Sequence, residues 1–240
     1  MNENPHIVSA FDKDLRQIEN LVVTMGGLVE QQLEQAAEVI ISRDLELADQ
    51  LIASDDEVDK LEIEIDSLVV RIIALRQPKA QDLRSVLAAL KVAADLERIG
   101  DYAKNLAKRT HVLAQVPIVG DSAKSVRRMC KMVRQMVKDV LDAYLTRDEA
   151  AANEVWLRDE EVDQIHNNLF RALLTYMLED PRNITPCMHL LFIAKNVERM
   201  GDHTTSIAEQ IQFLVSGEMP EEDRPKGDVT STTLVEAKAR

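Results

Sequence analysis

The sequence predicts an all-α protein made of two tandem three-helix bundles. Helix-forming residues are abundant, whereas aromatic residues make up only 3% of the chain, which disfavours β-sheets. Long stretches have apolar residues at helical spacing, and the pattern of one half returns in the other. With 240 residues, 45% of them hydrophobic, the chain is long enough to bury one large core or two small ones.

The first half predicts three helices. The most regular pattern belongs to the second of these, which ends at Pro78 because proline cannot continue a helix. A helix from about Ser9 to Ser42 precedes it, and one from about Lys79 to His111 follows it. The apolar seam of the second helix is formed by Leu51, Val58, Leu61, Ile65, Leu68, Ile72 and Leu75.

The second half repeats this order after a linker that contains Pro117 and Gly120. Helices are expected at about Ser122–Thr146, Arg147–Glu179 and Ile184–Ser216, with Pro181 in the role of Pro78. After these the composition turns to Pro, Gly, Thr and charged residues, which predicts a disordered tail. The expected organisation is a first repeat at residues 1–112, a linker at 113–121, a second repeat at 122–216 and a tail at 217–240.

The repeat is visible residue by residue. Arg43-Asp44 returns as Arg147-Asp148, and the triplet Asp55, Val58 and Asp59 returns at the same offset. The hexamer LERIGD at residues 96–101 returns as VERMGD at residues 197–202. A chance match of two such hexamers is improbable, so the two halves are interpreted as a duplication.

Carboxylates at a spacing of four are the candidate functional residues. Side chains four apart share one helix face, where like charges repel unless a cation neutralises them. Two antiparallel helices per repeat could bring these acidic flanks together, and carboxylate clusters favour hard cations such as ferric iron, manganese, magnesium or calcium. Zinc also accepts carboxylate ligands. The pairs are Asp55 with Asp59, Glu97 with Asp101, Asp159 with Asp163, and Glu198 with Asp202.

Two alternatives remain open from the residues alone. The acidic stripes could be solvated faces of a metal-free helical scaffold, which metal content would reveal. A di-metal carboxylate enzyme is the other alternative, because helical bundles host such centres, and Asp163 is followed by His166 three residues later. The absence of a phosphate-binding loop of the GxxxxGK[ST] type and of a nucleophile beside a base argues against catalysis.

Charge and targeting patterns narrow the partners and the location. A net charge of −13 repels nucleic acid and anionic lipid, so neither is expected as a direct partner. Cys130 and Cys187 have no metal-binding spacing and are expected to be free thiols in a reducing compartment. The start from Met1 to Asp14 lacks the pattern of a signal peptide, and no apolar run would insert into a membrane. A cytoplasmic protein is expected.

The strings LERIGD and VERMGDH, together with RIIALRQPKAQDLR at residues 71–84, resemble the signature of the PhoU family, the accessory regulators of bacterial high-affinity phosphate transport. The resemblance extends from Asp12 to about Ser216. It implies multinuclear metal clusters of iron, manganese or zinc, with magnesium also compatible. The second repeat differs from the first, because Ser206 stands where the first motif is followed by Asn105. The ligands that the resemblance implies are Asp55, Asp59, Glu97, Asp101, Asp159, Asp163, Glu198 and Asp202.

The resemblance also implies a non-enzymatic role. Such a protein is expected to restrain the phosphate-starvation response, and to modulate phosphate uptake, by contact with other proteins. The implied partners are the sensor histidine kinase of the phosphate two-component system and the ATPase subunit or permease of the phosphate ABC transporter. A homodimer is expected for paired bundles, although no residue pattern defines its interface.

Overall fold

The computed structural model describes residues 5–218, 227–230 and 233. Its elements confirm the predicted all-α class of two tandem three-helix bundles. The second helix ends close to the predicted position, at Arg76, and the fourth and sixth helices end at the predicted residues. The fifth helix begins two residues later than expected. The elements are α1 (Pro5–Ser42), α2 (Leu45–Arg76), α3 (Gln81–Leu113), α4 (Ser122–Thr146), α5 (Glu149–Glu179), the 3₁₀ helix η1 (Pro181–Asn183) and α6 (Ile184–Ser216).

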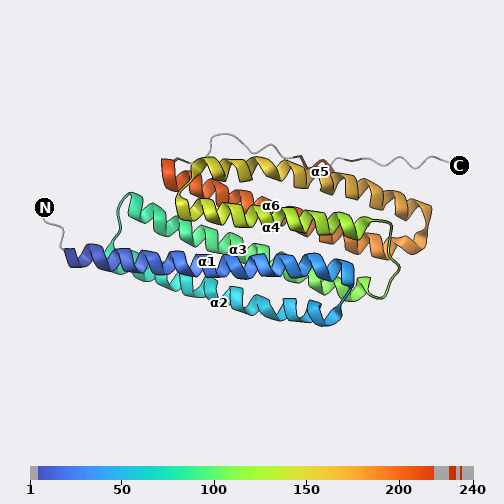
Figure 1. Cartoon of the computed structure of the whole chain (residues 1–240), viewed down its shortest axis with the longest axis horizontal. Coiled ribbons are helices and arrows are strands. Elements are labelled where there is room, and N and C mark those ends of the chain that lie inside the picture. Colours follow the sequence, from blue (N-terminus) through green and yellow to red (C-terminus); the bar gives the residue numbers. More distant parts are fainter. Residues whose placement is uncertain (1–4, 219–226, 231–232, 234–240) are drawn as a thin grey trace.

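The two bundles lie side by side and share one core. Helices α1, α2 and α3 pack on one another, as do α4, α5 and α6, and the bundles join where α1 meets α4 and α3 meets α6. Helices α2 and α5 therefore occupy the two outer edges (Figure 1). The buried apolar side chains of both bundles form a single continuous cluster. Within the described ranges, no helix combines the length and the apolar character that a membrane crossing requires.

The breaks between the first two helices of each repeat have the same construction. Arg43 and Arg147 both adopt left-handed backbone conformations with φ of 56°. Each is followed by an aspartate that caps the next helix. Asp44 accepts hydrogen bonds from two backbone N–H groups of α2 at 2.9 and 3.1 Å, and Asp148 accepts one from α5 at 3.0 Å. Predicting the fifth helix from Arg147 placed this capping turn inside the helix.

The predicted seam of α2 is buried over most of its length. Five of its residues are in the core, and Leu61 packs against the core while partly exposed. The prediction was wrong for Leu75, which is 69% exposed. A three-and-four pattern drifts by about 20° per heptad relative to a straight helix, so its last position has turned away from the core. The buried residues are Leu51, Val58, Ile65, Leu68 and Ile72.

The polypeptide beyond α6 begins with Gly217, whose φ of 85° and N–H bond to the Phe213 carbonyl (2.9 Å) terminate the helix. Disorder is predicted for residues 217–240, but 219–226, 231–232 and 234–240 lie outside the described residues. The short segment Gly227–Thr230 is described, and it lies against α5 and α6.

Candidate metal centres

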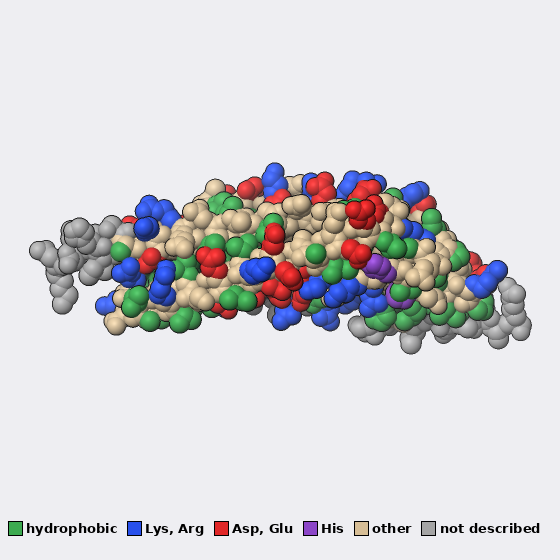
Figure 2. Space-filling view, turned by 90° about the horizontal axis from the view of Figure 1, so that it is seen from below, with side chains coloured by type: hydrophobic (Ala, Val, Ile, Leu, Met, Phe, Trp, Pro, Cys, Tyr) green, Lys and Arg blue, Asp and Glu red, His purple; other side chains and the backbone are tan. Residues whose placement is uncertain are grey.

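The eight predicted carboxylates lie on two helix pairs, α2 with α3 and α5 with α6. In each pair the two helices are in direct contact, so the acidic flanks meet along a seam as the sequence predicts. Figure 2 shows acidic side chains gathered near the middle of the face that lies at the bottom of Figure 1. Each repeat therefore has one candidate site, on the seam between its outer helix and the inner helix that meets the other bundle.

The first site is built around Asp55, a carboxylate that is only 1% exposed. The Nζ atom of Lys104 lies 2.5 Å from Asp55 Oδ2 and 3.9 Å from Asp101 Oδ1. Asp55 Oδ1 is buried and has no hydrogen-bond partner. Burial raises the pKa of Asp55, while the hydrogen bond from Lys104 opposes that rise. The lysine thus satisfies one oxygen of this carboxylate and leaves the other without a donor.

A glycine makes room for the buried oxygens. A Cβ on Gly100 would lie 2.9 Å from Gln32 Oε1 and 3.3 Å from Asp55 Oδ1. Gln32 is 2% exposed, and its Nε2 donates to Ser54 Oγ at 3.2 Å, but its Oε1 has no hydrogen-bond partner. Gly100 therefore allows two buried oxygens without donors to approach the α3 backbone, and this explains a glycine in the middle of a helix despite its cost of about 1 kcal/mol.

The two remaining carboxylates of the first site belong to the same electrostatic cluster. The Glu97 side chain is 17% exposed. Burial and the neighbouring Asp101 raise the pKa of Glu97 to about 7, and Glu62 and Asp59 add to this rise. Asp59 also raises the pKa of Asp55. The structure thus brings together all four residues predicted for this site.

The second site is more deeply buried. Asp159, Asp163 and Glu198 are 2%, 1% and 4% exposed. A Cβ on Gly201 would collide with Asp159 Oδ1, so this glycine repeats the role of Gly100. Lys195 Nζ lies 2.7 Å from Glu198 Oε1.

Glu198 connects the fourth predicted ligand to the second site. Its Oε2 is buried without a hydrogen-bond partner. Burial raises the pKa of Glu198, and Asp202 raises it further, while Lys195 opposes the rise. All four predicted carboxylates of the second repeat therefore lie in one region.

The two sites use different auxiliary residues, and the sequence prediction missed them. Gln32 occupies a position in the apolar pattern of α1, whereas Met136 holds the corresponding place in α4. A polar residue within an apolar seam was the signal that could have identified Gln32. Lys104 follows the first motif, but Lys195 precedes the second motif by three residues, so a comparison of the repeats does not pair them.

The donor set fits a hard cation. In the described part of the chain, no three His, Cys, Asp or Glu side chains are grouped so as to hold a metal ion as they stand. However, Asp55 Oδ1, Gln32 Oε1 and Glu198 Oε2 are buried oxygens without hydrogen-bond donors. Such atoms are costly unless a donor or a cation satisfies them. Oxygen ligands of this kind suit magnesium, manganese or ferric iron, and carboxylates also bind zinc.

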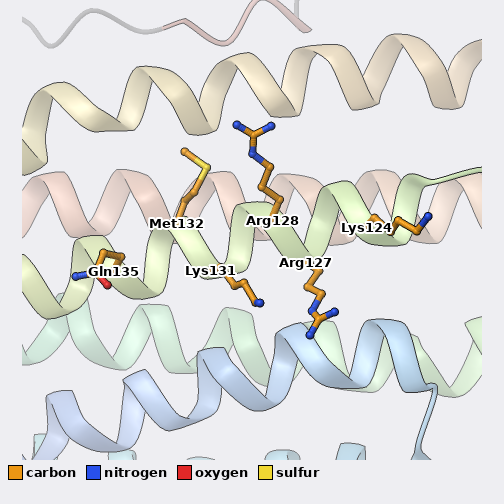
Figure 3. Close-up of a pocket in the computed structure, with 6 residues that line it drawn as sticks. All are labelled: Lys124, Arg127, Arg128, Lys131, Met132 and Gln135. Atoms are coloured by element: carbon orange, nitrogen blue, oxygen red, sulfur yellow. The ribbon is translucent and has the colours of Figure 1, made fainter.

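A basic surface on α4 contrasts with the acidic character of the chain. Figure 3 shows that Arg128 and Met132 extend from α4 toward α5, whereas Arg127 extends toward α1. Arg128 and Lys131 are exposed. A neighbouring groove runs between α1 and α4, where Arg127 and Arg134 face Glu38 and Glu34 across 3.5 and 2.8 Å. The shallow pocket of Figure 3 is lined by Lys124, Arg127, Arg128, Lys131, Met132 and Gln135.

The raised pKa of Glu97 predicts a stability that declines with pH when cations are removed. Between pH 4.5 and about 7 the folded protein keeps a proton on Glu97 that the unfolded chain releases. The stabilisation that Glu97 contributes to the fold is therefore fully present below pH 4.5 and is lost as the pH rises through about 7. We expect the melting temperature in chelator to fall less between pH 5 and pH 8 for Glu97→Gln than for the wild type. Glu57→Gln, which changes an exposed side chain, is the control. An equal fall in melting temperature for the wild type and Glu97→Gln would contradict the raised pKa of Glu97.

Comparison with known proteins gives a consistent result. The PhoU domain family matches twice, at residues 22–110 and 126–211. A PhoU homologue from Rhizobium meliloti, a phosphate-specific transport system accessory protein, is 46% identical over 95% of this chain and 96% of its own length. The phosphate-specific transport system accessory protein PhoU from Escherichia coli is 39% identical over 91% of this chain and 90% of its own length.

Solved structures agree with these sequence matches. The crystal structure of PhoU from Pseudomonas aeruginosa superimposes with a TM-score of 0.84 at 38% identity, and the match covers 87% of this chain and all of the other. The crystal structure of the phosphate transport system regulatory protein PhoU from Streptococcus pneumoniae superimposes with a TM-score of 0.82 at 26% identity, and the match covers 88% of this chain and all of the other.

Proposed function

Because the chain belongs to the PhoU family of phosphate-specific transport system accessory proteins, we propose that it restrains the phosphate-starvation response and modulates high-affinity phosphate uptake. Members of this family are accessory and regulatory proteins, and this chain is not an enzyme. It acts in the cytoplasm, as a homodimer, by contact with a sensor histidine kinase and with the ATPase subunit or permease of the phosphate ABC transporter. The match of the PhoU domain family to both halves of the chain is the observation that carries this proposal.

The acidic seams are the proposed metal centres. Asp55, Asp59, Glu97 and Asp101 would hold metal in the first repeat, and Asp159, Asp163, Glu198 and Asp202 would hold it in the second. A bound cluster of iron, manganese or zinc, or magnesium in its place, would supply positive charge to buried carboxylates. The chain positions these oxygens on rigid helices, and Gly100 and Gly201 leave the space beside them.

The basic surface of α4 is the proposed contact with a partner. Six of the 25 residues of α4 are Lys or Arg, although the net charge of the chain is −13, and Arg128 and Lys131 among them are exposed. A concentrated patch of this sign attracts an acidic protein surface and speeds association with it. Nucleic acid is a poor alternative, because the whole chain repels a phosphate backbone.

Deleting the gene and complementing it tests the proposal. We expect the deletion strain to express phosphate-starvation genes in ample phosphate, and wild-type protein to restore repression. The Arg128→Glu/Lys131→Glu protein should fold normally but fail to restore repression, because both side chains are exposed and the charge of the contact is reversed. A phosphate-responsive reporter measures the outcome.

The control removes the same two positive charges from another helix. Lys60→Glu/Arg71→Glu changes exposed side chains on α2 and should complement fully. Repression that persists in the deletion strain would disprove the regulatory role. Full complementation by the α4 variant would disprove the contact surface and leave the regulatory role intact.

A further inference from the structure

The C-terminal segment Gly227–Thr230 is seated on the second candidate metal site. Gly227 N donates to Asp163 Oδ2 at 2.8 Å, and Asn167 Nδ2 donates to the Gly227 carbonyl at 2.6 Å. Val229 N donates back to Asn167 Oδ1 at 3.1 Å. This segment runs along α5 in Figure 1. Three hydrogen bonds to two side chains of α5 fix its register.

Asp228 contributes a carboxylate to the same place. Lys195 Nζ lies 2.8 Å from Asp228 Oδ2, and the backbone N and hydroxyl of Thr230 donate to Asp228 Oδ1 at 2.8 and 2.7 Å. His166 Nδ1 is 3.7 Å from Asp228 Oδ1. Burial alone would raise the pKa of Asp228, but the hydrogen bonds from Lys195 and Thr230 lower it below its usual range. Asp228 is therefore seated as a carboxylate whose two oxygens already have donors.

The seated segment uses atoms that a cation would need. The Gly227 N–H engages Asp163 Oδ2, and Lys195, which holds Asp228, also engages Glu198 Oε1. A Cβ at Gly227 would lie 3.1 Å from the Asp163 Cβ, so the backbone approaches this ligand closely. An oxygen that accepts a hydrogen bond in this way has less capacity to bind a metal ion. In the described residues, Lys104 is the group that engages Asp55 in the first repeat, and no tail segment lies there.

We propose that Gly227–Thr230 is a built-in competitor for the second acidic site, seated when the site is free of cations and displaced when a divalent cation binds. The inference rests on the proposed metal-binding function. Competition reduces the apparent affinity by the fraction of molecules whose site is open, so a segment seated nine-tenths of the time weakens binding about tenfold.

Titration of full-length protein with Mn²⁺ tests this. The Glu97→Ala/Asp101→Ala background removes binding at the first site, so calorimetry reports the second. There, Asp228→Asn should bind Mn²⁺ about tenfold tighter, because the segment loses its pairing with Lys195. In protein with the wild-type tail, hydrogen exchange of the peptide that contains Gly227 and Val229 should speed up on addition of Mn²⁺. Val229→Ala is the matched control, because its side chain is 43% exposed and its backbone bond to Asn167 is kept.

The outcomes separate this inference from the function on which it rests. Tighter binding by Asp228→Asn together with faster exchange of the tail supports competition. Weaker binding by Asp228→Asn would make Asp228 a metal ligand and overturn the proposal, and so would unchanged affinity with unchanged exchange. In both of these cases Mn²⁺ still binds and the metal-binding function stands. If the wild-type protein bound no Mn²⁺ at the first site and none at the second, both the competition proposal and the metal-binding function would be overturned.

Discussion

We expect the Glu97→Ala/Asp101→Ala protein to lose metal binding at the first site while staying folded and helical. Both residues flank the core, and alanine has a high helix propensity. Removing two carboxylate ligands should weaken binding by about a hundredfold or more, since changes to the groups that surround a ligand already cost about ten- to a hundredfold. The metal-free variant should be as stable as the wild type or slightly more so, because repulsion within the pair is relieved. Metal analysis together with circular dichroism measures both effects.

A matched variant separates ligand loss from a change of net charge. Glu57→Ala/Glu64→Ala removes two carboxylates from exposed positions of α2. This control should retain the wild-type metal content and the wild-type rise in melting temperature on addition of Mn²⁺. An unchanged metal content in Glu97→Ala/Asp101→Ala would show that these residues are not ligands, whatever the control does.

Lys104→Met should destabilise the metal-free protein by about 3 kcal/mol, because it leaves the buried Asp55 carboxylate without its counter-charge. For a protein of this size that corresponds to a melting temperature lower by roughly 6–12 °C. Mn²⁺ should stabilise this variant more than it stabilises the wild type, since the ammonium group no longer competes for Asp55 Oδ2. Thermal unfolding in chelator and in Mn²⁺ gives both values.

Two comparisons make this result specific. Lys108→Met changes an exposed lysine one turn further along α3 and should leave the melting temperature nearly unchanged. Asp55→Asn added to Lys104→Met should recover much of the lost stability, because it removes the uncompensated charge. If Lys104→Met and Lys108→Met have the same melting temperature, the pairing of Lys104 with Asp55 does not stabilise the fold.

Much of the fold could be predicted because local signals and the repeat agree. Arg43-Asp44 and Arg147-Asp148 mark the breaks, and Pro78 lies just beyond the end of α2. The exposed position of Leu75 was missed, because a spacing rule does not track the drift of a straight helix over several turns. The sharing of one core by the two bundles could not be predicted, because each amphipathic pattern shows only that a face is buried and not which helix covers it.

The candidate sites could be predicted only as far as their carboxylates. Spacing on one helix places Glu97 and Asp101 on one face, and the repeat doubles that signal. Gln32 comes from a helix that contributes none of the predicted carboxylates, and Lys195 has no counterpart at the matching position of the first repeat. Asp228 lies far along the chain from its partners. Contacts of this kind depend on tertiary packing, which a pattern within one helix does not contain.

The shared core bears on how such a chain could have arisen. A single repeat on its own would expose the apolar faces of the two helices that now meet the other bundle, and it would need a second copy to cover them. The present chain is in this sense a homodimer whose subunits have been fused. Because both halves belong to one chain, matching positions can hold different residues, as Gln32 and Met136 do. A symmetric dimer of one repeat would bind metal in the same way at both of its acidic sites, whereas a single chain with two different repeats can bind it differently at each.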